Sequence, residues 1–402
     1  MQPPRGPSCV TVQQPSLPAY RVPVFEALAK RLQSPGDGNR SHVVRVLHGR
    51  AAGSPPSVTA RGFDAQHVPV HQCNTPFGPL WWHSAQWRTV DRQRADVAVL
   101  VWNTRFLSLA PALLRARLCR MPVVLWGHGY SRREGRWRRW LRNTIARLAD
   151  AVMVYNHTAA QRLIEDGHDP ERIFIALNSL DQMPIESARH HWLARPQELS
   201  DFRRRHDLSP GRTVLFTSRL QPRNRLDLLL HATSQLAADM PGLKVVIVGE
   251  GEPERARLRA MAKGLGIADR IMFTGAIYDE TALAPWFLCS DVFCYPANIG
   301  LSVLHAFGYG VPVVTGDNVD SHNPEIEALS AGENGLYFRH GDADSLAAVL
   351  RTMLNDEPLR RRMGQAALRT VRERYTLDRM VQGFVAAVDY AIARRGPRTI
   401  RS

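Results

Sequence analysis

The stretch DVFCYPANIGLSVLHAFGYGVPVVTG, residues 291–316, decides how the fold of this chain is interpreted. A β-prone run over 292–295 is followed by Gly300 and by a predicted short helix over 301–307. A second β-prone run covers 311–315. Glycine at such a junction lets a ligand approach the backbone closely, and the N–H groups at a helix start suit a phosphate. The pattern therefore predicts a phosphate-binding strand–loop–helix unit.

Short apolar runs alternate with amphipathic helical windows through most of the chain. Strands separated by helices need crossover connections, so they form parallel sheets that are covered on both faces. Two such series predict an α/β chain with two doubly wound, Rossmann-like domains facing each other across a cleft, where a ligand binds at the carboxyl ends of the strands. The predicted strands are 9–13, 42–47, 97–101, 123–126, 152–155 and 173–177 in the first series, and 213–217, 244–248, 271–273, 292–295 and 311–315 in the second.

The boundary between the two domains is placed at residues 179–200. This stretch contains two prolines and no strand pattern, so it is expected to be a linker between domains over 1–178 and 201–376. The last helical window, 377–394, is expected to pack back near the first domain. The polar, proline-containing ends, 1–7 and 395–402, are expected to be disordered.

Composition favours a globular protein. Of the 402 residues, 44% are hydrophobic and 22% are charged. No uncharged apolar run is long enough to span a membrane, and the N-terminus lacks the apolar core of a signal peptide. The five cysteines are an odd number without a CxxC pair, so they are expected to be reduced thiols of a cytoplasmic protein, without a metal site. A peripheral position at the inner face of the plasma membrane is the alternative location.

The formal net charge of +15 predicts an anionic partner. The densest basic segment is 132–147, where arginines flank an apolar stripe at helical spacing. Two alternatives stay open: the arginines meet an anionic membrane surface, or the stripe covers a sheet and the arginines are solvated. Trp81, Trp82 and Trp87 form a second aromatic group, either an acceptor-lipid lip or core. The stripe consists of Trp137, Trp140, Leu141, Ile145 and Leu148.

The chain resembles retaining glycosyltransferases of family 4, which have the two-domain GT-B fold. The resemblance implies transfer of a sugar from a nucleotide-sugar donor to an acceptor hydroxyl with retention at the anomeric carbon, without a metal or other cofactor. Bacterial relatives of this type suggest a lipid-linked or saccharide acceptor, in polysaccharide or lipopolysaccharide biosynthesis. The segments that carry the resemblance are LWGHGYS (125–131), FTSRLQPRNRLDLLLHA (216–232), VVIVGEGEPE (245–254), YPANIGLSVLHAFGYGVPVVTGDN (295–318) and GENGLYF (332–338).

The resemblance places the donor diphosphate at Arg219, because a guanidinium stays charged and binds two oxygens at once. The lysine that the family has five residues later falls on Asn224, and the neighbouring Arg225 is the predicted substitute. Three further donor-binding candidates follow strand ends of the second domain, and ordinary glycine turns are the alternative for them. These three are Gly249, Glu250 and Gly275.

The paired-glutamate motif of the family falls on Ala297 and His305, and neither is a glutamate. Asn298 is the candidate that contacts the donor sugar in place of the first glutamate. His305 is a candidate ribose contact because imidazole donates one hydrogen bond and accepts another; the alternative is a histidine packed in a helix. The backbone of Gly300 and Leu301 is the predicted phosphate contact.

His128 is the catalytic candidate, because the resemblance places a histidine of this loop near the donor sugar and the acceptor, where imidazole is suited to neutral pH. The alternative is a turn histidine bonded to backbone. Asn103 and Arg105 are acceptor-side candidates.

Two other functions stay open: a nucleotide-sugar epimerase, and a catalytically lapsed partner protein in polysaccharide assembly. Binding to nucleic acid is not expected, because no sequence motif supports it.

Overall fold

The computed structural model describes residues 8–33, 42–49, 57–59, 62–76, 78–130 and 135–395. The chain divides into two compact units, which we call unit 1 (Met1–Asn178 with Leu377–Ser402) and unit 2 (Ser179–Thr376). Both termini that were expected to be disordered lie outside the described residues, except that Arg395 ends the last helix.

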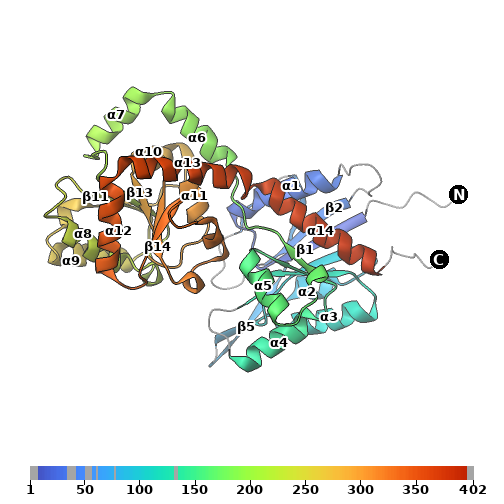
Figure 1. The fold of residues 1–402 in the computed structure, drawn as a ribbon. Coiled ribbons are helices and arrows are strands. Elements are labelled where there is room, and N and C mark those ends of the chain that lie inside the picture. Colours follow the sequence, from blue (N-terminus) through green and yellow to red (C-terminus); the bar gives the residue numbers. More distant parts are fainter. Residues whose placement is uncertain are drawn as a thin grey trace. The chain divides into compact units, whose positions relative to one another are not determined.

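Unit 1 contains a parallel sheet of seven strands in the order β3-β2-β1-β6-β7-β8-β9, with helices on both faces (Figure 1). Its strands are β1 Ser8–Gln14, β2 His42–His48, β3 Asp64–His67, β6 Val97–Val101, β7 Val123–Gly127, β8 Ala151–Val154 and β9 Ile173–Ile175, with a separate pair β4 Val70–Thr75 and β5 Gly78–His83. Its helices are η1 Ala19–Arg21, α1 Val22–Gln33, α2 Ser84–Thr89, α3 Leu109–Leu118, α4 Arg136–Ala146, α5 His157–Glu165, η2 Pro170–Arg172 and α14 Leu377–Arg395.

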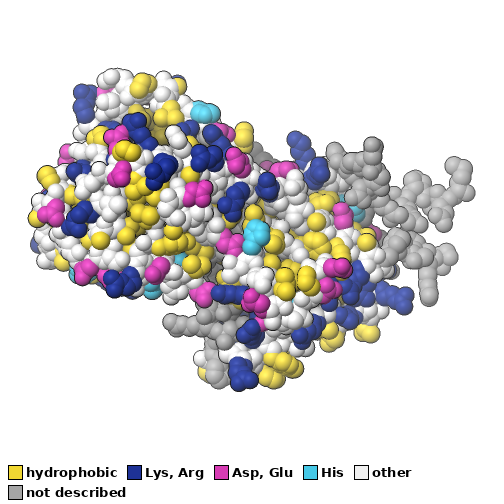
Figure 2. Space-filling view, in the orientation of Figure 1, with side chains coloured by type: hydrophobic (Ala, Val, Ile, Leu, Met, Phe, Trp, Pro, Cys, Tyr) yellow, Lys and Arg dark blue, Asp and Glu magenta, His cyan; other side chains and the backbone are white. Residues whose placement is uncertain are grey.

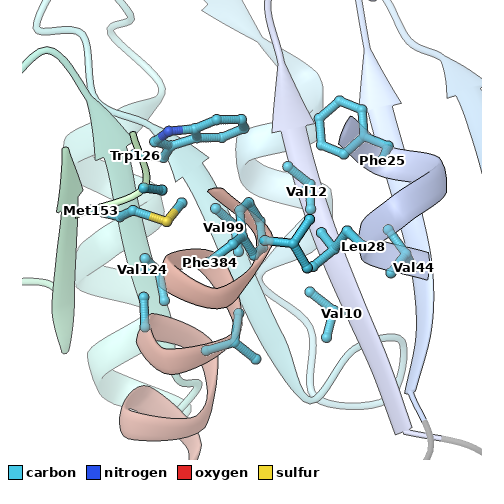
Figure 3. Close-up of a cluster of buried hydrophobic side chains, with 14 of the residues drawn as sticks. Val10, Val12, Phe25, Leu28, Val44, Val99, Val124, Trp126, Met153 and Phe384 are labelled. Carbon is cyan, nitrogen blue, oxygen red and sulfur yellow. The ribbon is translucent and has the colours of Figure 1, made fainter. Parts of the chain in front are cut away.

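The middle of the unit 1 sheet is buried on both faces because strands such as β6 and β8 are apolar at every position. In β6, Val97 and Val99 belong to one core cluster, whereas Ala98 and Leu100 belong to the other. Successive side chains of a strand point to opposite faces, so one apolar run serves both cores. Figure 3 shows the first cluster, in which Phe384 of α14 lies among the side chains of the strands.

The last helix, α14, belongs to unit 1 although it follows unit 2 in the sequence. It packs against β8 and β9, and a Cβ on Gly383 would lie 2.1 Å from the carbonyl oxygen of Ile175. Its last residue, Arg395, forms an ion pair of 2.7 Å with Asp150, at the end of the loop before β8. Because Gly383 has no side chain, the helix can approach the end of β9 closely.

Three strands of unit 1 were not predicted. β3 is short and polar, and β4 pairs with β5 in an antiparallel hairpin outside the main sheet. Most residues of β4 are exposed, so it shows none of the alternation between apolar and polar residues that marks a half-buried strand.

Unit 2 contains a second parallel sheet, of six strands in the order β12-β11-β10-β13-β14-β15 (Figure 1). Its strands are β10 Thr213–Thr217, β11 Lys244–Val248, β12 Ile271–Gly275, β13 Val292–Cys294, β14 Val313–Gly316 and β15 Gly335–Phe338. Its helices are α6 Met183–Leu193, α7 Pro196–Arg205, η3 Pro222–Asn224, α8 Leu226–Leu236, α9 Glu254–Gly264, η4 Ala268–Arg270, α10 Glu280–Leu288, α11 Ser302–Gly308, η5 Val319–Ser321, η6 Pro324–Ala328, α12 Ala343–Asn355 and α13 Glu357–Glu373. The two parallel sheets confirm the predicted fold class.

The linker expected over 179–200 is wrong. This stretch belongs to unit 2 and contains α6 and the start of α7. Its two prolines stand in the first turns of these helices, where the missing N–H group costs nothing. The prolines therefore mark helix starts, and the indole of Trp192 in α6 donates a hydrogen bond of 2.8 Å to the carbonyl oxygen of Thr281 in α10.

Candidate functional site

The strand order of unit 2 reverses between β10 and β13, which lie side by side although they are far apart in the sequence. In a doubly wound sheet, ligands bind at the carboxyl ends of the strands at such a reversal point. The loops after β10 and β13 contain most of the predicted donor-binding residues. The fold therefore brings Arg219, Asn224 and Arg225 to the same sheet edge as Asn298, Gly300 and Leu301.

The loop after β10 is held by the backbone of the glycine loop after β11. The N–H of Ser218 donates to the carbonyl oxygen of Val248 at 3.1 Å, and that of Leu220 to Glu250 at 2.8 Å. A Cβ on Gly249 would lie 1.9 Å from the carbonyl oxygen of Ser218, so glycine is required there. Gly249 thus allows its own loop to pack directly against the loop that carries Arg219.

Arg219 lies between these two anchored residues, and its side chain is exposed. Within the described residues it takes part in no hydrogen bond or ion pair. A charged guanidinium that is fixed at its backbone and unpaired at its tip is suited to bind an anionic group.

Asn224 has a framework role that the sequence did not indicate. It is 2% exposed, and its Oδ1 accepts a hydrogen bond from the N–H of Gln221 at 2.8 Å. Its Nδ2 donates to the hydroxyl of Tyr295 at 2.7 Å, and that hydroxyl donates to Ser218 Oγ at 3.2 Å. Burial raises the pKa of Tyr295, which keeps the hydroxyl protonated as a donor. The amide of Asn224 thus ties the two loops together, and the donor contact of this candidate donor-binding residue stays a prediction.

Arg225 follows with a left-handed backbone, at φ 55°, and begins α8. Its guanidinium pairs with Asp227 at 3.0 Å, and the arginine side chain remains 40% exposed. The pairing is on the surface, where such an ion pair is weak. Arg225 therefore keeps access to a ligand, and its donor contact stays a prediction.

The loop after β13 is fixed by two residues near η5. His322 is buried, and its Nδ1 accepts a hydrogen bond from the N–H of Ile299 at 3.1 Å, while its Nε2 donates to Gly316 at 2.8 Å. Asn323 donates to the carbonyl oxygens of Asn298 and Ile299 at 3.3 and 3.1 Å. The loop leads into α11, one residue later than predicted. This framework fixes the backbone of Gly300 and Leu301, whose phosphate contact stays a prediction.

His305 is packed between helices. Its Nε2 lies 2.8 Å from Glu280 Oε1 of α10, and its ring lies 4.8 Å from that of Phe287. Tyr309 donates to the same carboxylate oxygen at 2.5 Å. Burial acts to raise the pKa of Glu280, but the hydrogen bonds from His305 and Tyr309 hold it below its ordinary value. The arrangement favours the alternative of a packed helix histidine, and a ribose contact stays a prediction for the remaining Nδ1.

Tyr278 was missed by the sequence analysis. It is 86% exposed in the loop after β12, and its hydroxyl donates to Glu250 Oε1 at 2.9 Å, which raises the pKa of the tyrosine. The N–H of Gly249 also donates to the carbonyl oxygen of Gly275 at 2.8 Å. Gly249, Glu250 and Gly275 therefore belong to one connected edge, on which Tyr278 presents an exposed ring. Only its position after a glycine at a strand end could have signalled it.

His128 follows β7 in unit 1 and is exposed, with its ring 5.0 Å from that of Tyr155. The next residue, Gly129, has φ 74°, and a Cβ there would lie 3.1 Å from Val154. The glycine thus allows the turn that presents the imidazole at the carboxyl edge of the sheet. His128 stays the catalytic candidate.

Asn103 and Arg105 follow β6, next to the point where the strand order of unit 1 reverses between β1 and β6. Asn103 Oδ1 accepts a hydrogen bond from the N–H of Arg105 at 3.0 Å, which forms a local turn. The carbonyl oxygen of Arg105 accepts one from the N–H of Trp81 in β5, also at 3.0 Å. Both residues therefore help to seat the hairpin, and their acceptor contacts stay predictions.

A buried polar network fills the reversal point of unit 1. Gln13 Oε1 accepts hydrogen bonds from the N–H of Val101 at 2.9 Å and from Gln86 Nε2 at 3.2 Å. His83, fully buried, places its Nε2 2.9 Å from the carbonyl oxygen of Gln14. Burial lowers the pKa of His83 to about 4, so the ring is neutral and donates this hydrogen bond.

The basic helix α4 presents its tryptophans to solvent. Trp137 is 69% and Trp140 52% exposed, and their rings stack at 4.7 Å. The apolar stripe therefore does not cover the sheet as a whole, because Ile145 is buried and the tryptophans are not. Figure 2 shows hydrophobic and basic side chains next to each other over α4. Residues 132–134 of the basic segment lie outside the described residues.

The arginines of α4 divide into two groups. Arg139 and Arg142 contact Asp166, and Arg142 is buried at 3.1 Å from it. Arg136 and Arg138 are exposed.

In the second aromatic group, Trp82 and Trp87 are 40% and 42% exposed, so they are not core residues. Among the described residues, no helix is both long and apolar enough to cross a lipid bilayer.

Two families match the chain, one in each half. Residues 13–178 match the family described as "Glycosyl transferase 4-like domain". Residues 200–370 match the one described as "Glycosyl transferases group 1". The two matched ranges lie within unit 1 and unit 2, respectively.

Among curated relatives, the D-inositol 3-phosphate glycosyltransferase of Geodermatophilus obscurus is 27% identical over 337 residues, which are 81% of this chain and 68% of that protein. The GDP-mannose-dependent alpha-(1-6)-phosphatidylinositol monomannoside mannosyltransferase of Mycobacterium tuberculosis is 28% identical, over 50% of this chain and 53% of that protein. The chain spans about half the length, or less, of several of the first relatives that it matches.

Among solved structures, Anabaena HepE in complex with UDP has the same fold. It superposes with a TM-score of 0.69 at 16% identity, over 95% of this chain and 99% of that one. At this identity the likeness establishes the fold alone.

Proposed function

The chain belongs to the family 4 type of glycosyltransferases, with the GT-B fold, and we propose that it transfers a sugar from a nucleotide-sugar donor to a hydroxyl of a glycolipid or polysaccharide acceptor. The names of two relatives support a transferase of this kind. One is a GDP-mannose-dependent enzyme that acts on a phosphatidylinositol mannoside, and the other acts on inositol 3-phosphate. The observation that carries the proposal is Arg219 at the strand reversal of unit 2, an exposed arginine without a partner among the described residues.

The donor diphosphate binds between the loops after β10 and β13. Arg219 contacts its oxygens, and Arg225 and the backbone at Gly300 and Leu301 add further donors. As the bond between the anomeric carbon and the diphosphate breaks, negative charge develops on the leaving oxygen, and preorganised cations and N–H groups stabilise it. We propose that no metal is needed, since the arginines supply the positive charge that a divalent cation would supply.

The nucleoside lies against the edge formed by Gly249, Glu250 and Gly275, where the exposed ring of Tyr278 offers a stacking surface. Asn298 lies in the loop that would receive the donor sugar. The specificity for one sugar or base follows from contacts in these loops.

The acceptor hydroxyl attacks the anomeric carbon from the face that the diphosphate leaves, so that configuration is retained. Its proton passes to the departing diphosphate oxygen. His128, exposed at the carboxyl edge of unit 1, orients the hydroxyl or stabilises charge near the reacting carbon. Asn103 and Arg105 are the proposed acceptor-side contacts.

An anionic membrane surface is the proposed partner of α4, consistent with a peripheral location at the inner face of the plasma membrane. At 3.6 residues per turn, Trp137 and Trp140 lie on the side opposite the buried Ala146, with Arg136 and Arg138 on either flank. Aromatic rings with flanking cations suit the interface of an anionic bilayer.

Vesicle co-sedimentation tests this surface. Arg136→Gln with Arg138→Gln should weaken binding to phosphatidylglycerol vesicles about thirtyfold, at roughly 1 kcal/mol per cation. Trp137→Ser with Trp140→Ser should also weaken it. Met183→Ser, which changes a side chain 71% exposed on unit 2, is the control and should have no effect. Equal binding by all variants would remove α4 from the interface.

The transferase proposal is tested by thermal unfolding in the presence of nucleoside diphosphates and their sugars. A ligand at about a hundred times its dissociation constant adds roughly 2.7 kcal/mol to the folded state. A selective shift identifies the donor, which is then incubated with candidate acceptors. Donor turnover without an acceptor would favour the epimerase, and no shift from any ligand would favour a lapsed partner protein.

A further inference from the structure

Arg21 is a buried cation that the proposed mechanism does not use. It ends η1, directly after the loop that follows β1, and only 6% of it is exposed. Its guanidinium takes part in no hydrogen bond or ion pair among the described residues, and its Nη1 is fully buried. A buried charge without a counter-charge is costly, and native proteins seldom keep one without a reason.

Aromatic rings surround the guanidinium. Its carbon lies 4.9 Å from the ring centroid of Trp126, 5.2 Å from that of Tyr155 and 5.4 Å from that of Tyr20. The ring faces attract the cation but provide no hydrogen-bond acceptor for its N–H groups. The indole Nε1 of Trp126 is likewise buried, without an acceptor in the part of the chain that the structure describes. Two neighbouring side chains therefore have donors to offer and no acceptor to satisfy them.

Arg21 and Trp126 lie near the ends of the strands of unit 1. Trp126 lies in β7 near its carboxyl end, Tyr155 directly follows β8, and Figure 3 shows Trp126 at one end of the buried cluster. The exposed ring of His128 is 5.0 Å from that of Tyr155. Arg21 thus lies at the carboxyl edge of the sheet, where doubly wound domains bind ligands, next to the catalytic candidate.

We propose that Arg21 binds a phosphate group of the acceptor, and that it selects phosphorylated acceptors. A phosphate supplies the negative charge and the acceptor oxygens that the guanidinium and the indole lack, and a guanidinium binds two such oxygens at once. The proposal rests on the proposed transferase function only in assigning the phosphate to the acceptor rather than to the donor.

The proposal has a consequence for stability. Because the charge is unpaired in the protein without ligand, Arg21→Met should leave the melting temperature unchanged or raise it, since methionine fills a similar apolar space. Arg142→Met is the matched control. Arg142 is also a buried arginine, but it pairs with Asp166, so its removal should lower the melting temperature.

Binding is tested with inorganic pyrophosphate in Arg219→Ala protein, which lacks the main donor contact. We expect saturable binding that Arg21→Met weakens roughly ten- to a hundredfold, the loss of a charge-assisted hydrogen bond. In protein with Arg219 intact, the same substitution should leave the affinity for nucleoside diphosphates unchanged. Arg21→Lys and Arg21→Gln, measured in the same way, cover the case in which Arg21→Met fails to fold.

Four results would overturn the proposal. A lower melting temperature of Arg21→Met with unchanged pyrophosphate binding would give Arg21 a packing role. Unchanged binding in every folded variant would place the anion elsewhere. Binding only at molar concentrations would mean an adventitious ion only. Loss of nucleoside diphosphate affinity in Arg21→Met would assign the phosphate to the donor. The effect of Arg219→Ala on nucleotide affinity reports separately on the proposed transferase function.

Discussion

The two sheets reverse their strand order at different kinds of junction. In unit 2, the buried side chains of Asn224 and Tyr295 tie together the loops at the junction between β10 and β13. The first of these loops displays an exposed arginine, Arg219. In unit 1, the junction between β1 and β6 is filled by the side chains of Gln13, Gln86 and His83, and the nearby Arg21 is buried. The same topology thus presents an exposed cation at one junction, and a buried cation near a buried polar network at the other.

This difference predicts different sensitivities. Substitution of the exposed cation at the unit 2 junction should lower ligand affinity while the fold persists. A site with buried ionisable groups should lose stability with a change of pH. The four predictions below test the contrast, in order of decreasing effect.

Arg219→Ala should have the largest effect on donor affinity. Loss of a bidentate contact to a diphosphate should lower donor affinity on the order of a hundredfold, with little change in melting temperature, because the side chain is exposed. Isothermal titration with the donor that the thermal-unfolding screen identifies measures the affinity. Arg362→Ala removes the same charge from an exposed position on α13 and is the control. Unchanged affinity in folded Arg219→Ala would remove this residue from the site.

Acid should destabilise unit 1 through His83. Its pKa is lowered from 6.5 to about 4 in the folded state, so as pH falls the unfolded chain binds the proton first. Stability is therefore full above pH 6.5 and decreases between pH 6.5 and 4, by about 3 kcal/mol for this group. Burial lowers the pKa of the neighbouring His48 as well, which adds to the loss.

Denaturant unfolding at several pH values, followed by hydrogen exchange in each unit, measures this loss. His83→Gln keeps a donor for the carbonyl oxygen of Gln14 and should flatten the profile. His128→Gln, at an exposed position, is the control and should leave the profile as it is. A wild-type profile that is flat from pH 6.5 to 4 would contradict the neutral buried histidine.

Gly249→Ala separates close packing from backbone strain within unit 2. The new Cβ would meet the carbonyl oxygen of Ser218, so the Arg219 loop must move, and we expect a loss of about 2 kcal/mol in stability together with weaker donor binding. Gly275→Ala meets nothing within 4 Å, although its φ of 81° is strained for alanine. It should cost about 1 kcal/mol and weaken donor binding less than Gly249→Ala does, because no neighbouring loop has to move. Equal donor affinities in the two variants would contradict the role of the close contact.

His305→Gln should have the smallest effect. The substitution weakens the bond to Glu280 and should cost about 1 kcal/mol in the free energy of unfolding, without a change in donor affinity. Thermal unfolding and donor titration measure the two quantities. Weaker donor binding at unchanged stability would return His305 to the donor site.

The local patterns of the sequence predicted much of the fold. The predicted strand 244–248 coincides with β11, and the helical window 377–394 corresponds to α14, because the spacing of apolar residues is a local signal. The sequence did not predict the hairpin β4–β5. It also did not predict the helix starts at Pro184 and Pro196. Exposed polar strands lack alternation, and proline marks both linkers and first turns.

The candidate site was predicted less completely, because its contacts join residues that are distant in the sequence. Asn224 is a framework residue through Tyr295, and His305 is packed through Glu280; neither partner is near in the chain. Arg21 is surrounded by rings from residues 126 and 155. The position of Arg219 after a strand is, by contrast, a local feature of the sequence, and its contact with the donor stays a prediction.

Hydrogen–deuterium exchange with and without the nucleotide-sugar donor tests the central claim most directly. The account predicts donor-dependent protection of the loops at 218–225, 249–251 and 297–302, all in unit 2, and its loss in Arg219→Ala. Protection confined to unit 1, or protection of these loops that survives Arg219→Ala unchanged, would contradict a donor site centred on Arg219.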